Sequence, residues 1–325
     1  MSFILRRVGF YAVAIWVSIT INFFLPRLMP GDPAARLMAR ISTQLRPEEI
    51  DAMRRVFGFS DAPIFNQYLE YLGHILQGDL GKSISRFPSP VTDVIGMGLF
   101  WTILLGAVAL VISFIVGNVL GIIGTWRRGG LIDSVMPPLL IFVGAFPYFW
   151  LAMVALYVLG FQLNLFPLRH AYANNLSPGF NLTFVGSVIR HLILPAGTIV
   201  LVSVGGWALG MRNAMVSTLS EDYVIYAEAK GLRQRRIMFN YAARNALLPA
   251  VTSLGISIGF ILSGALLTEI VFSYPGLGFL LLSAVQNLDY PLLQGLLLMT
   301  TMAVLIANFI VDIAYLWLDP RIRVR

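Results

Sequence analysis

The sequence contains no cysteine, three histidines, and only Lys82 and Lys230 as lysines among its 23 basic residues. The absence of cysteine excludes disulfide bonds, cysteine-ligated metal sites and thiol nucleophiles. Charged residues make up only 12% of the chain and hydrophobic residues 58%, which excludes an intrinsically disordered chain and argues against a soluble single-core protein. The net charge of +7 does not by itself indicate nucleic-acid binding, because that requires basic residues clustered on one solvated face.

Long stretches without charge are abundant instead. A helix that crosses a bilayer needs about 20 mostly apolar residues. Two gaps do not qualify: 170–189 has the composition of a loop, and 270–288 is broken at Tyr274–Gly278, which predicts a turn and a short helix at the membrane surface. The sequence therefore predicts an all-α membrane protein with six transmembrane helices, within the runs 8–26, 94–126, 134–168, 191–211, 245–268 and 290–311.

The distribution of basic residues predicts how these helices are oriented. With the N-terminus inside, the cytoplasmic segments hold 13 basic and five acidic residues, whereas the outer segment 27–93 holds eight of each. Since Lys and Arg concentrate on the cytoplasmic side, both termini are expected to be cytoplasmic. The apolar run after Arg6 and Arg7 is long for a signal-peptide core and no small-residue cleavage site follows promptly, so we expect a retained first helix.

The outer segment carries helical patterns of its own. Residues 47–57 begin with a proline and acidic residues and end at a glycine, and residues 64–76 repeat large apolar side chains at helical spacing. Both stretches predict short amphipathic helices on the outer surface. Such helices cover the bundle or dock an external partner, and the sequence leaves both roles open.

The loop 212–248, between the fourth and fifth predicted spans, is the most informative cytoplasmic stretch. A Thr-x-x-Glu capping box at Thr218–Glu221 predicts a helix start, and a second helical stretch runs from Arg233 to Leu248. The arginines of this loop are explained by the positive-inside rule alone. The small residues Ala227, Ala229 and Gly231 indicate more, because they let another protein approach the backbone closely. We therefore expect a compact knob of two short helices joined at a glycine.

Two short motifs resemble enzyme signatures but lack the required context. Gly81-Lys82-Ser83 resembles the end of a phosphate-binding loop, yet the required glycine is replaced by Leu76, so the chain is not expected to hydrolyse ATP. Gly255–Gly259 fits the Gly-x-Ser-x-Gly nucleophile pattern inside an apolar span, where it is better explained as a helix–helix contact of small residues, like Gly117, Gly121 and Gly124. An intramembrane hydrolase using Ser257 would need a base, and that span contains no His or Lys.

The remaining candidates for chemistry are the three histidines and the acidic residues that lie within predicted membrane spans or at their ends. His74, His170 and His191 are widely spaced, so no metal site is expected. Glu269 and Asp312 lie near the ends of the fifth and sixth spans, where an acid is a functional candidate but can equally reach water or a backbone donor. The chain is thus expected to hold no cofactor or metal and to have no catalytic residue.

At this point six strings of residues carry a resemblance that runs almost end to end. The chain resembles the permease subunit of an ATP-binding-cassette (ABC) importer in the dipeptide/oligopeptide/nickel branch. The matching stretches, in family order, are LMPGDP (28–33), GDLG (78–81), DYV with AKGL (222–224 and 229–232), RNA (244–246), TEIVF with PGLG (268–272 and 275–278), and LDPRIR (318–323).

The resemblance implies a type I importer permease fold in three parts: residues 1–26, with the first membrane helix; residues 27–97, outside the membrane; and residues 98–325, a five-helix core bearing the coupling loop. It also implies a bacterial or archaeal cytoplasmic membrane, a second homologous permease subunit, an external substrate-binding protein, and two cytoplasmic ATPase subunits that bind ATP and magnesium. The candidates for structural or gating roles are Glu269, Pro275, Gly276, Gly278 and Asp312.

The resemblance further implies that the 212–248 loop couples to the ATPase. The general family signature is Glu-Ala-Ala-x-x-x-Gly, and only Ala227 and Gly231 match it here, because Ile225 and Tyr226 occupy the first two places. Members of the peptide branch commonly lack this Glu. Its absence means that a salt bridge used in other branches cannot form here. The coupling residues carried over are Asp222, Tyr223, Ala227, Glu228, Ala229, Lys230 and Gly231.

Substrate identity stays open between peptides and small oligosaccharides. Nickel import is an alternative within the same family, although the absence of cysteine and the scattered histidines give it no support in this chain. An intramembrane hydrolase and a gated pore without ATP are alternatives from other classes.

Overall fold

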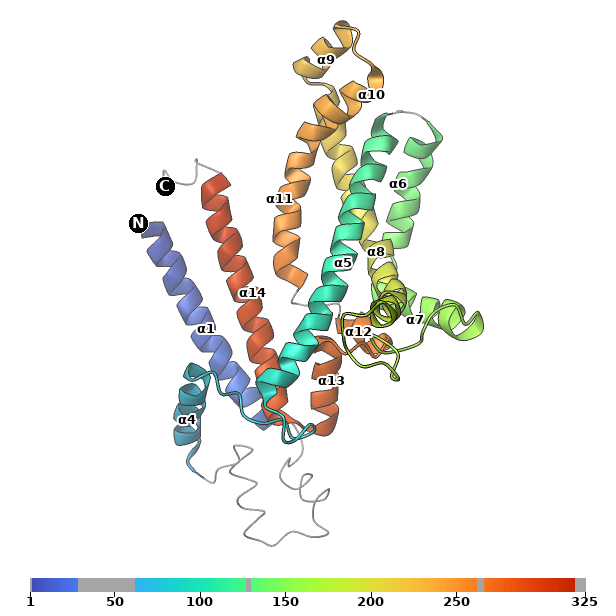
Figure 1. Ribbon diagram of the computed structural model, residues 1–325. Helices are drawn as coiled ribbons and strands as arrows, with labels where there is room; N and C mark the ends of the chain where they lie inside the picture. The colour runs from blue at the N-terminus through green and yellow to red at the C-terminus, as the bar shows by residue number, and fades with distance from the viewer. Residues whose placement is uncertain (1, 29–61, 127–129, 262–265, 319–325) are drawn as a thin grey trace. The chain divides into compact units, whose positions relative to one another are not determined.

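A computed structural model describes residues 2–28, 62–126, 130–261 and 266–318. Apart from one isolated β-bridge between Lys82 and Pro90, the regular structure of these residues is helical (Figure 1). They form two compact units, the first within Met1–Thr102, Leu262–Leu266 and Pro275–Arg325 and the second within Ile103–Ile261 and Leu267–Tyr274. The predicted helix over 47–57 lies outside the described residues.

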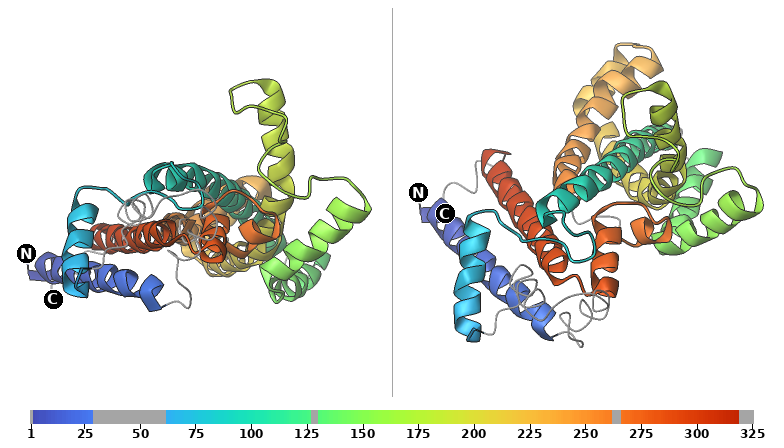
Figure 2. Two further views of the ribbon diagram at one scale, coloured as in Figure 1. Left: turned by 90° about the horizontal axis from the view of Figure 1, so that it is seen from below. Right: turned by 60° about the horizontal axis from the view of Figure 1, so that its bottom comes forward.

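Unit 1 contains the two ends of the chain. Its helices are α1 (Ser2–Leu28), α4 (Ile64–Leu76), the first third of α5 (Val91–Trp126), α13 (Leu277–Asn287) and α14 (Tyr290–Leu318). Helix α1 packs along α14 (Figure 2), and hydrogen bonds join α4 to the C-terminal part of α1. The amphipathic helix predicted over residues 64–76 is confirmed as α4.

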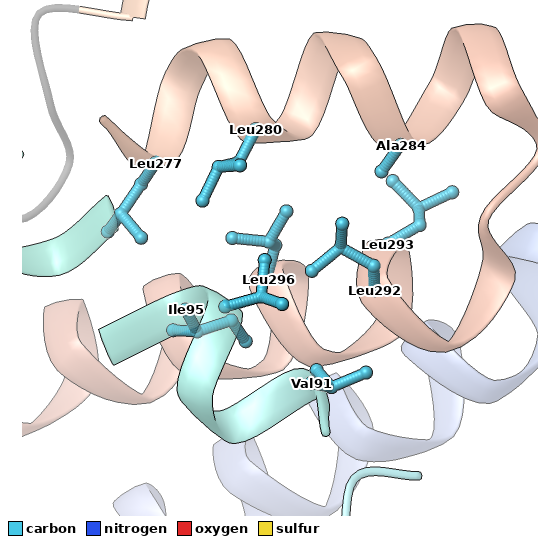
Figure 3. Packing of buried hydrophobic residues seen from close by; sticks show 9 residues of the cluster. Val91, Ile95, Leu277, Leu280, Ala284, Leu292, Leu293 and Leu296 are labelled. Carbon is cyan, nitrogen blue, oxygen red and sulfur yellow. The ribbon is translucent and has the colours of Figure 1, made fainter. Parts of the chain in front are cut away.

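The core of unit 1 is a cluster of aliphatic side chains from α5, α13 and α14, shown in Figure 3. Glycine allows the closest approach: a Cβ on Gly295 would lie 2.5 Å from Val91 Cγ1, and one on Gly98 would lie 2.4 Å from Leu280 Cδ1. The buried members are Val91, Val94, Ile95, Leu277, Leu280, Ala284, Leu292, Leu293 and Leu296.

Unit 2 is organised around the long helix α8 (Leu182–Leu219), which contacts α6 (Leu131–Gly144), α7 (Tyr148–Ala155) and α11 (Arg244–Phe260). The predicted small-residue contact of Gly117 and Gly121 is confirmed, because a Cβ on Gly121 would lie 2.6 Å from the carbonyl oxygen of Ala208. The remaining elements are η1 (Leu156–Gln162), α9 (Asp222–Ala229), α10 (Gln234–Arg236), η2 (Ile237–Ala243) and α12 (Leu266–Val271).

Four helices of the described residues are long and apolar enough to cross a membrane: Arg7–Leu25, Val91–Trp126, Leu182–Leu219 and Tyr290–Ile310. The pair Asp133–Gly144 and Tyr148–Gln162 would make a fifth, but it is bent by 90°. The expected fifth span, 245–268, appears as the 17-residue helix α11, followed by residues outside the described ones. The count of six and the orientation of the termini stay predictions.

The run 134–168 is not the straight span expected from its composition. Pro147 is the N-cap of α7, and a proline disfavours helical geometry at the residue before it, so α6 ends at Gly144 and the chain turns. Charge-free length alone does not reveal this bend.

The prediction of a loop over 170–189 is wrong for the second half of that range. Helix α8 already begins at Leu182, where the side chain of Asn181 accepts a 2.7 Å hydrogen bond from the N–H of Phe184. This asparagine, counted as a loop residue, is a helix N-cap. The turn and short helix expected within 270–288 are confirmed as α13, which begins at Leu277.

Candidate functional site

The predicted knob is present as α9 and α10 at the end of α8, and we define the knob as residues 220–243. The prediction that Thr218 caps the start of a helix is wrong. Helix α8 continues to Leu219, and the Thr218 hydroxyl donates to the carbonyl of Ala214 in the preceding turn, at 2.9 Å. Helix α9 begins instead at Asp222, after a turn at Ser220 and Glu221. The second helix runs without a break through η2 into α11, and Pro249 lies inside α11.

Gly231 ends α9 in a Schellman motif. The N–H of Gly231 bonds to the carbonyl of Glu228 at 2.8 Å, and the N–H of Leu232 bonds to the carbonyl of Ala227 at 3.4 Å. The φ of Gly231 is +69°, a left-handed conformation that glycine adopts without strain. A Cβ at this position would meet nothing within 4 Å. Glycine is therefore needed here for its backbone conformation and not for close packing.

One side of α9 is buried in a core that the knob shares with the ends of the neighbouring helices. Val224 and Ala227 are 1% and 3% exposed. We therefore expect Ala227 to stabilise the knob from within, not to touch a partner. The core consists of Ile122, Met211, Met215, Val224, Ala227, Ile237, Ala242, Ala243 and Ala246.

The opposite side of α9 is exposed. Ile225 and Tyr226 have exposed fractions of 51% and 68%, and Tyr223 lies near the edge with 37%. Ala229 is exposed between Ile225 and Tyr226 in the helical projection, so the centre of this face carries a single methyl group. The exposed face also contains Asp222, Glu228 and Lys230.

An ion pair joins α8 to α6 just before the knob. Arg212 donates from Nε and Nη2 to the same carboxylate oxygen of Asp133, at 3.0 Å and 2.8 Å. The side chains are 30% and 13% exposed, and such charge-assisted bonds hold two elements in a defined register. The start of α6 is thus attached to the end of α8.

A groove between α8 and α11 opens next to the knob, with a volume of about 420 Å³. Within the described part of the chain, its lining carries no acidic, basic or histidine side chain, and small residues and serines predominate. The lining residues are Ser203, Gly206, Trp207, Gly210, Met211, Ala214, Ala246, Pro249, Ala250, Ser253 and Ser257.

The groove does not support an intramembrane hydrolase. The hydroxyl of Ser257 donates to the carbonyl of Ser253 at 2.9 Å, within its own helix. Among the residues that the structure describes, no general base lines the groove beside it, and a nucleophilic serine needs one within hydrogen-bond reach. The helix contact expected at Gly255 is not made within the described residues, since a Cβ there would meet nothing within 4 Å; Gly259 has no described surroundings. Among the described residues, His, Asp and Glu form no cluster that could hold a metal ion.

The predicted structural or gating residues lie in turns and helix ends. Glu269 is fully buried in α12, and its carbonyl accepts a 2.8 Å bond from the N–H of Tyr274. In unit 1, Pro275 precedes the α13 N-cap Gly276, and Gly278 is buried in the first turn of α13. The side chain of Asp312, on α14, lies outside the described residues. A gating role for these positions stays a prediction.

A buried carboxylate in unit 1 was not singled out from the sequence. Asp289 is fully buried, and its Oδ2 accepts from the Ser85 N–H and hydroxyl at 2.8 Å and 2.7 Å and from the Ser83 hydroxyl at 2.5 Å. Its Oδ1 accepts from the N–H of Leu292 at 3.2 Å, so Asp289 also caps α14. Its place just before a helix of aliphatic residues is the sequence signal that identifies such a cap.

The exposed pair Ile225 and Tyr226 was noted in the sequence only as a departure from the family signature. Helical phase identifies them, because buried residues at 224 and 227 require residues 225, 226 and 229 to face outward.

Known proteins match the chain over nearly its whole length. The family model described as binding-protein-dependent transport system inner membrane component matches residues 117–324, and the corresponding N-terminal model matches residues 1–97. The di/tripeptide transport system permease protein DppB of Pseudomonas aeruginosa is 35% identical, and the match covers 99% of each chain. The dipeptide permease protein DppB of Escherichia coli and the oligopeptide permease protein AppB of Bacillus subtilis are 32% and 33% identical with the same coverage. The chain belongs to the family of inner-membrane components of binding-protein-dependent transport systems.

Proposed function

We propose that this chain is the permease subunit of an ABC importer that carries peptides across the cytoplasmic membrane. In this proposal two ATPase subunits bind the knob, an external binding protein supplies substrate, and a second homologous permease subunit completes the pathway. Support for peptides comes from the three relatives, whose names describe permease proteins for di/tripeptides, dipeptides and oligopeptides. Their similarity extends over the full chain.

The observation that carries the proposal is that the buried core beneath the knob shares residues with the groove. Met211 of α8 and Ala246 of α11 belong to the buried core beneath α9, and both also line the groove. Protein cores are close-packed and transmit displacement. A movement of α9 therefore shifts the helices on both sides of the groove.

The exposed side of α9 fits the role of an ATPase contact. The single methyl group of Ala229 allows a partner surface to approach the helix, and the aromatic ring of Tyr226 beside it provides contact area. The Arg212–Asp133 ion pair would extend the movement of α8 to α6. ATP-driven closure of the ATPases would thus rock the helices and open the groove to the inside.

The lining of the groove suits a passing peptide. Serine hydroxyls donate to and accept from backbone amides, and the absence of charge leaves the groove without preference for one kind of peptide side chain. Oligosaccharides also bind hydroxyls, so the lining alone does not distinguish the two substrates. The named relatives favour peptides.

Transport by the reconstituted system tests this proposal. The permease subunits, ATPases and binding protein in proteoliposomes should accumulate a labelled tripeptide only when ATP is present on the ATPase side. Excess unlabelled dipeptide should compete, and a β-linked oligosaccharide should not. Proteoliposomes with this chain alone should show no flux.

Two results would reject parts of the proposal. ATP-dependent accumulation of a labelled β-linked oligosaccharide without accumulation of the tripeptide would identify a sugar importer. Substrate flux through this chain in the absence of the ATPases would identify a gated pore.

A further inference from the structure

Helix α4 in unit 1 presents two apolar faces. The side chains of Tyr68 and Tyr71 face α1, whereas Phe65, Leu69 and Leu76 point elsewhere and are 66%, 50% and 88% exposed. Residues 65, 69, 72 and 76 lie within about 60° of each other in a helical projection, at 100° per residue. The second face is therefore a continuous apolar stripe.

A third, polar sector lies on the side of the apolar stripe that is remote from Tyr68. Asn66, Glu70 and His74 follow each other at four-residue spacing and are all exposed. His74 lies 3.3 Å from the carboxylate of Asp79 in a solvent-exposed pair. An isolated helix in water needs no apolar stripe opposite its polar sector, so the stripe indicates a second, apolar environment.

Contacts with α1 determine the depth at which α4 lies. The hydroxyl of Tyr68 is 2.7 Å from that of Thr20, the side-chain amide of Asn22 donates to Tyr71 Oη at 3.1 Å, and Arg27 donates to Gln67 at 3.2 Å. The candidate span of α1 is Arg7–Leu25. The contacts thus cover the last turns of the span and the residues just beyond it, about 10 Å of helix at 1.5 Å per residue.

The aromatic and basic side chains at this level are those typical of a membrane boundary. The Arg27 guanidinium lies 3.6 Å from the centroid of the Phe23 ring. Tyr68 and Tyr71 both pack on Phe23, and tyrosine is enriched where one end of the side chain is apolar and the other is polar. Burial is the main cause that raises the pKa of Tyr71 to about 12.

We infer that α4 lies in the boundary layer of the bilayer, with Phe65, Leu69 and Leu76 inserted among lipid acyl chains and Glu70 facing water. The helix then acts as an interfacial anchor that holds the end of α1 at a fixed depth. This inference concerns a lipid contact and does not depend on the substrate or on ATPase coupling.

The absence of cysteine makes a direct test possible, since single cysteines can be introduced without removing others. Full-length chains with Leu69→Cys or Leu76→Cys are labelled with an environment-sensitive fluorophore and reconstituted in phosphatidylcholine/phosphatidylglycerol nanodiscs. Glu70→Cys is the matched control, one residue from Leu69 on the same helix. Lipids with a doxyl group near the headgroup and aqueous iodide serve as the two quenchers.

The expected result is strong quenching of the probes at 69 and 76 by the doxyl lipid and weak quenching by iodide, with the reverse pattern at 70. Iodide quenching at 69 and 76 equal to that at 70 would overturn the inference, because the stripe would then face water. Protection from both quenchers would also overturn it, because a protein surface would then cover the stripe.

Discussion

The carboxylate of Asp289 joins separate stretches of unit 1 at the scale of single residues. It accepts hydrogen bonds from the turn at Ser83 and Ser85 and caps α14 through the N–H of Leu292. Because Asp289 and Ser83 are both fully buried, the Ser83 hydroxyl has no water to replace this partner if the carboxylate is removed.

Asp289→Ala is therefore expected to destabilise the protein by about 2 kcal/mol or more, the combined cost of a lost cap and of buried donors without a partner. The measurement is the thermal unfolding midpoint of the detergent-solubilised chain, which should fall by several degrees. Asp93→Ala, which removes an exposed carboxylate in the first turn of α5, is the control and should change the midpoint little. Equal midpoints for the two variants would contradict the assigned role of Asp289.

Ala227 and Ala229 show what a residue type alone does not reveal. Both are small residues in the predicted coupling segment, and the sequence treats them alike. The structure buries Ala227 in the core of the knob and exposes Ala229 at the centre of its free face. The difference arises from helical phase, which depends on where α9 begins, and the predicted start at Thr218 was wrong by several residues.

At the scale of elements, close contact between α5 and α8 depends on glycine. Added Cβ atoms at Gly117 and Gly121 would lie 2.9 Å and 2.6 Å from the backbone oxygens of Val204 and Ala208, which cannot rotate away. Gly255 in α11 has an open side, with nothing within 4 Å of an added Cβ. These glycines share a sequence context but not a packing role.

Gly121→Ala should destabilise the chain by about 1–3 kcal/mol, the usual cost of overpacking, and lower the yield of folded protein in fluorescence-detected size-exclusion chromatography. Gly255→Ala is the matched control. It should be neutral or slightly stabilising in the isolated chain, because alanine favours a helix by up to about 1 kcal/mol over glycine. Similar losses in the two variants would show that the α5–α8 contact is not the determining feature.

Much of the fold was predictable because apolar length and helical spacing are local properties of a sequence. The amphipathic helix at 64–76, the short helix after Gly276 and the knob were all predicted from such patterns and are confirmed. The bend at Pro147 and the early start of α8 at Leu182 were not predicted, because composition does not distinguish an N-cap from a loop residue. The groove depends on which faces of α8 and α11 meet, a long-range property that a single sequence does not show.

At the scale of the whole molecule, we propose that the exposed face of α9 is mechanically linked to the groove. Met211 and Ala246 provide that link, since each contributes to both the knob core and the groove lining. The ATPase contact itself is expected at Ala229 and its neighbours. A bulky residue there would hold a partner away from the helix while leaving the buried core of the knob unchanged.

The most direct test compares Ala229→Trp with Ala229→Ser in the assembled transporter in proteoliposomes. Peptide uptake and ATP hydrolysis are measured on the same preparation, with membrane insertion checked by the amount of reconstituted chain. We predict that the tryptophan variant inserts normally but loses peptide uptake by about tenfold or more. The reason is that weakening the binding free energy of the ATPase contact by about 1.4 kcal/mol lowers its affinity about tenfold. The serine variant should keep near-normal uptake. Normal peptide uptake in the tryptophan variant would contradict the proposed coupling between this face and the groove.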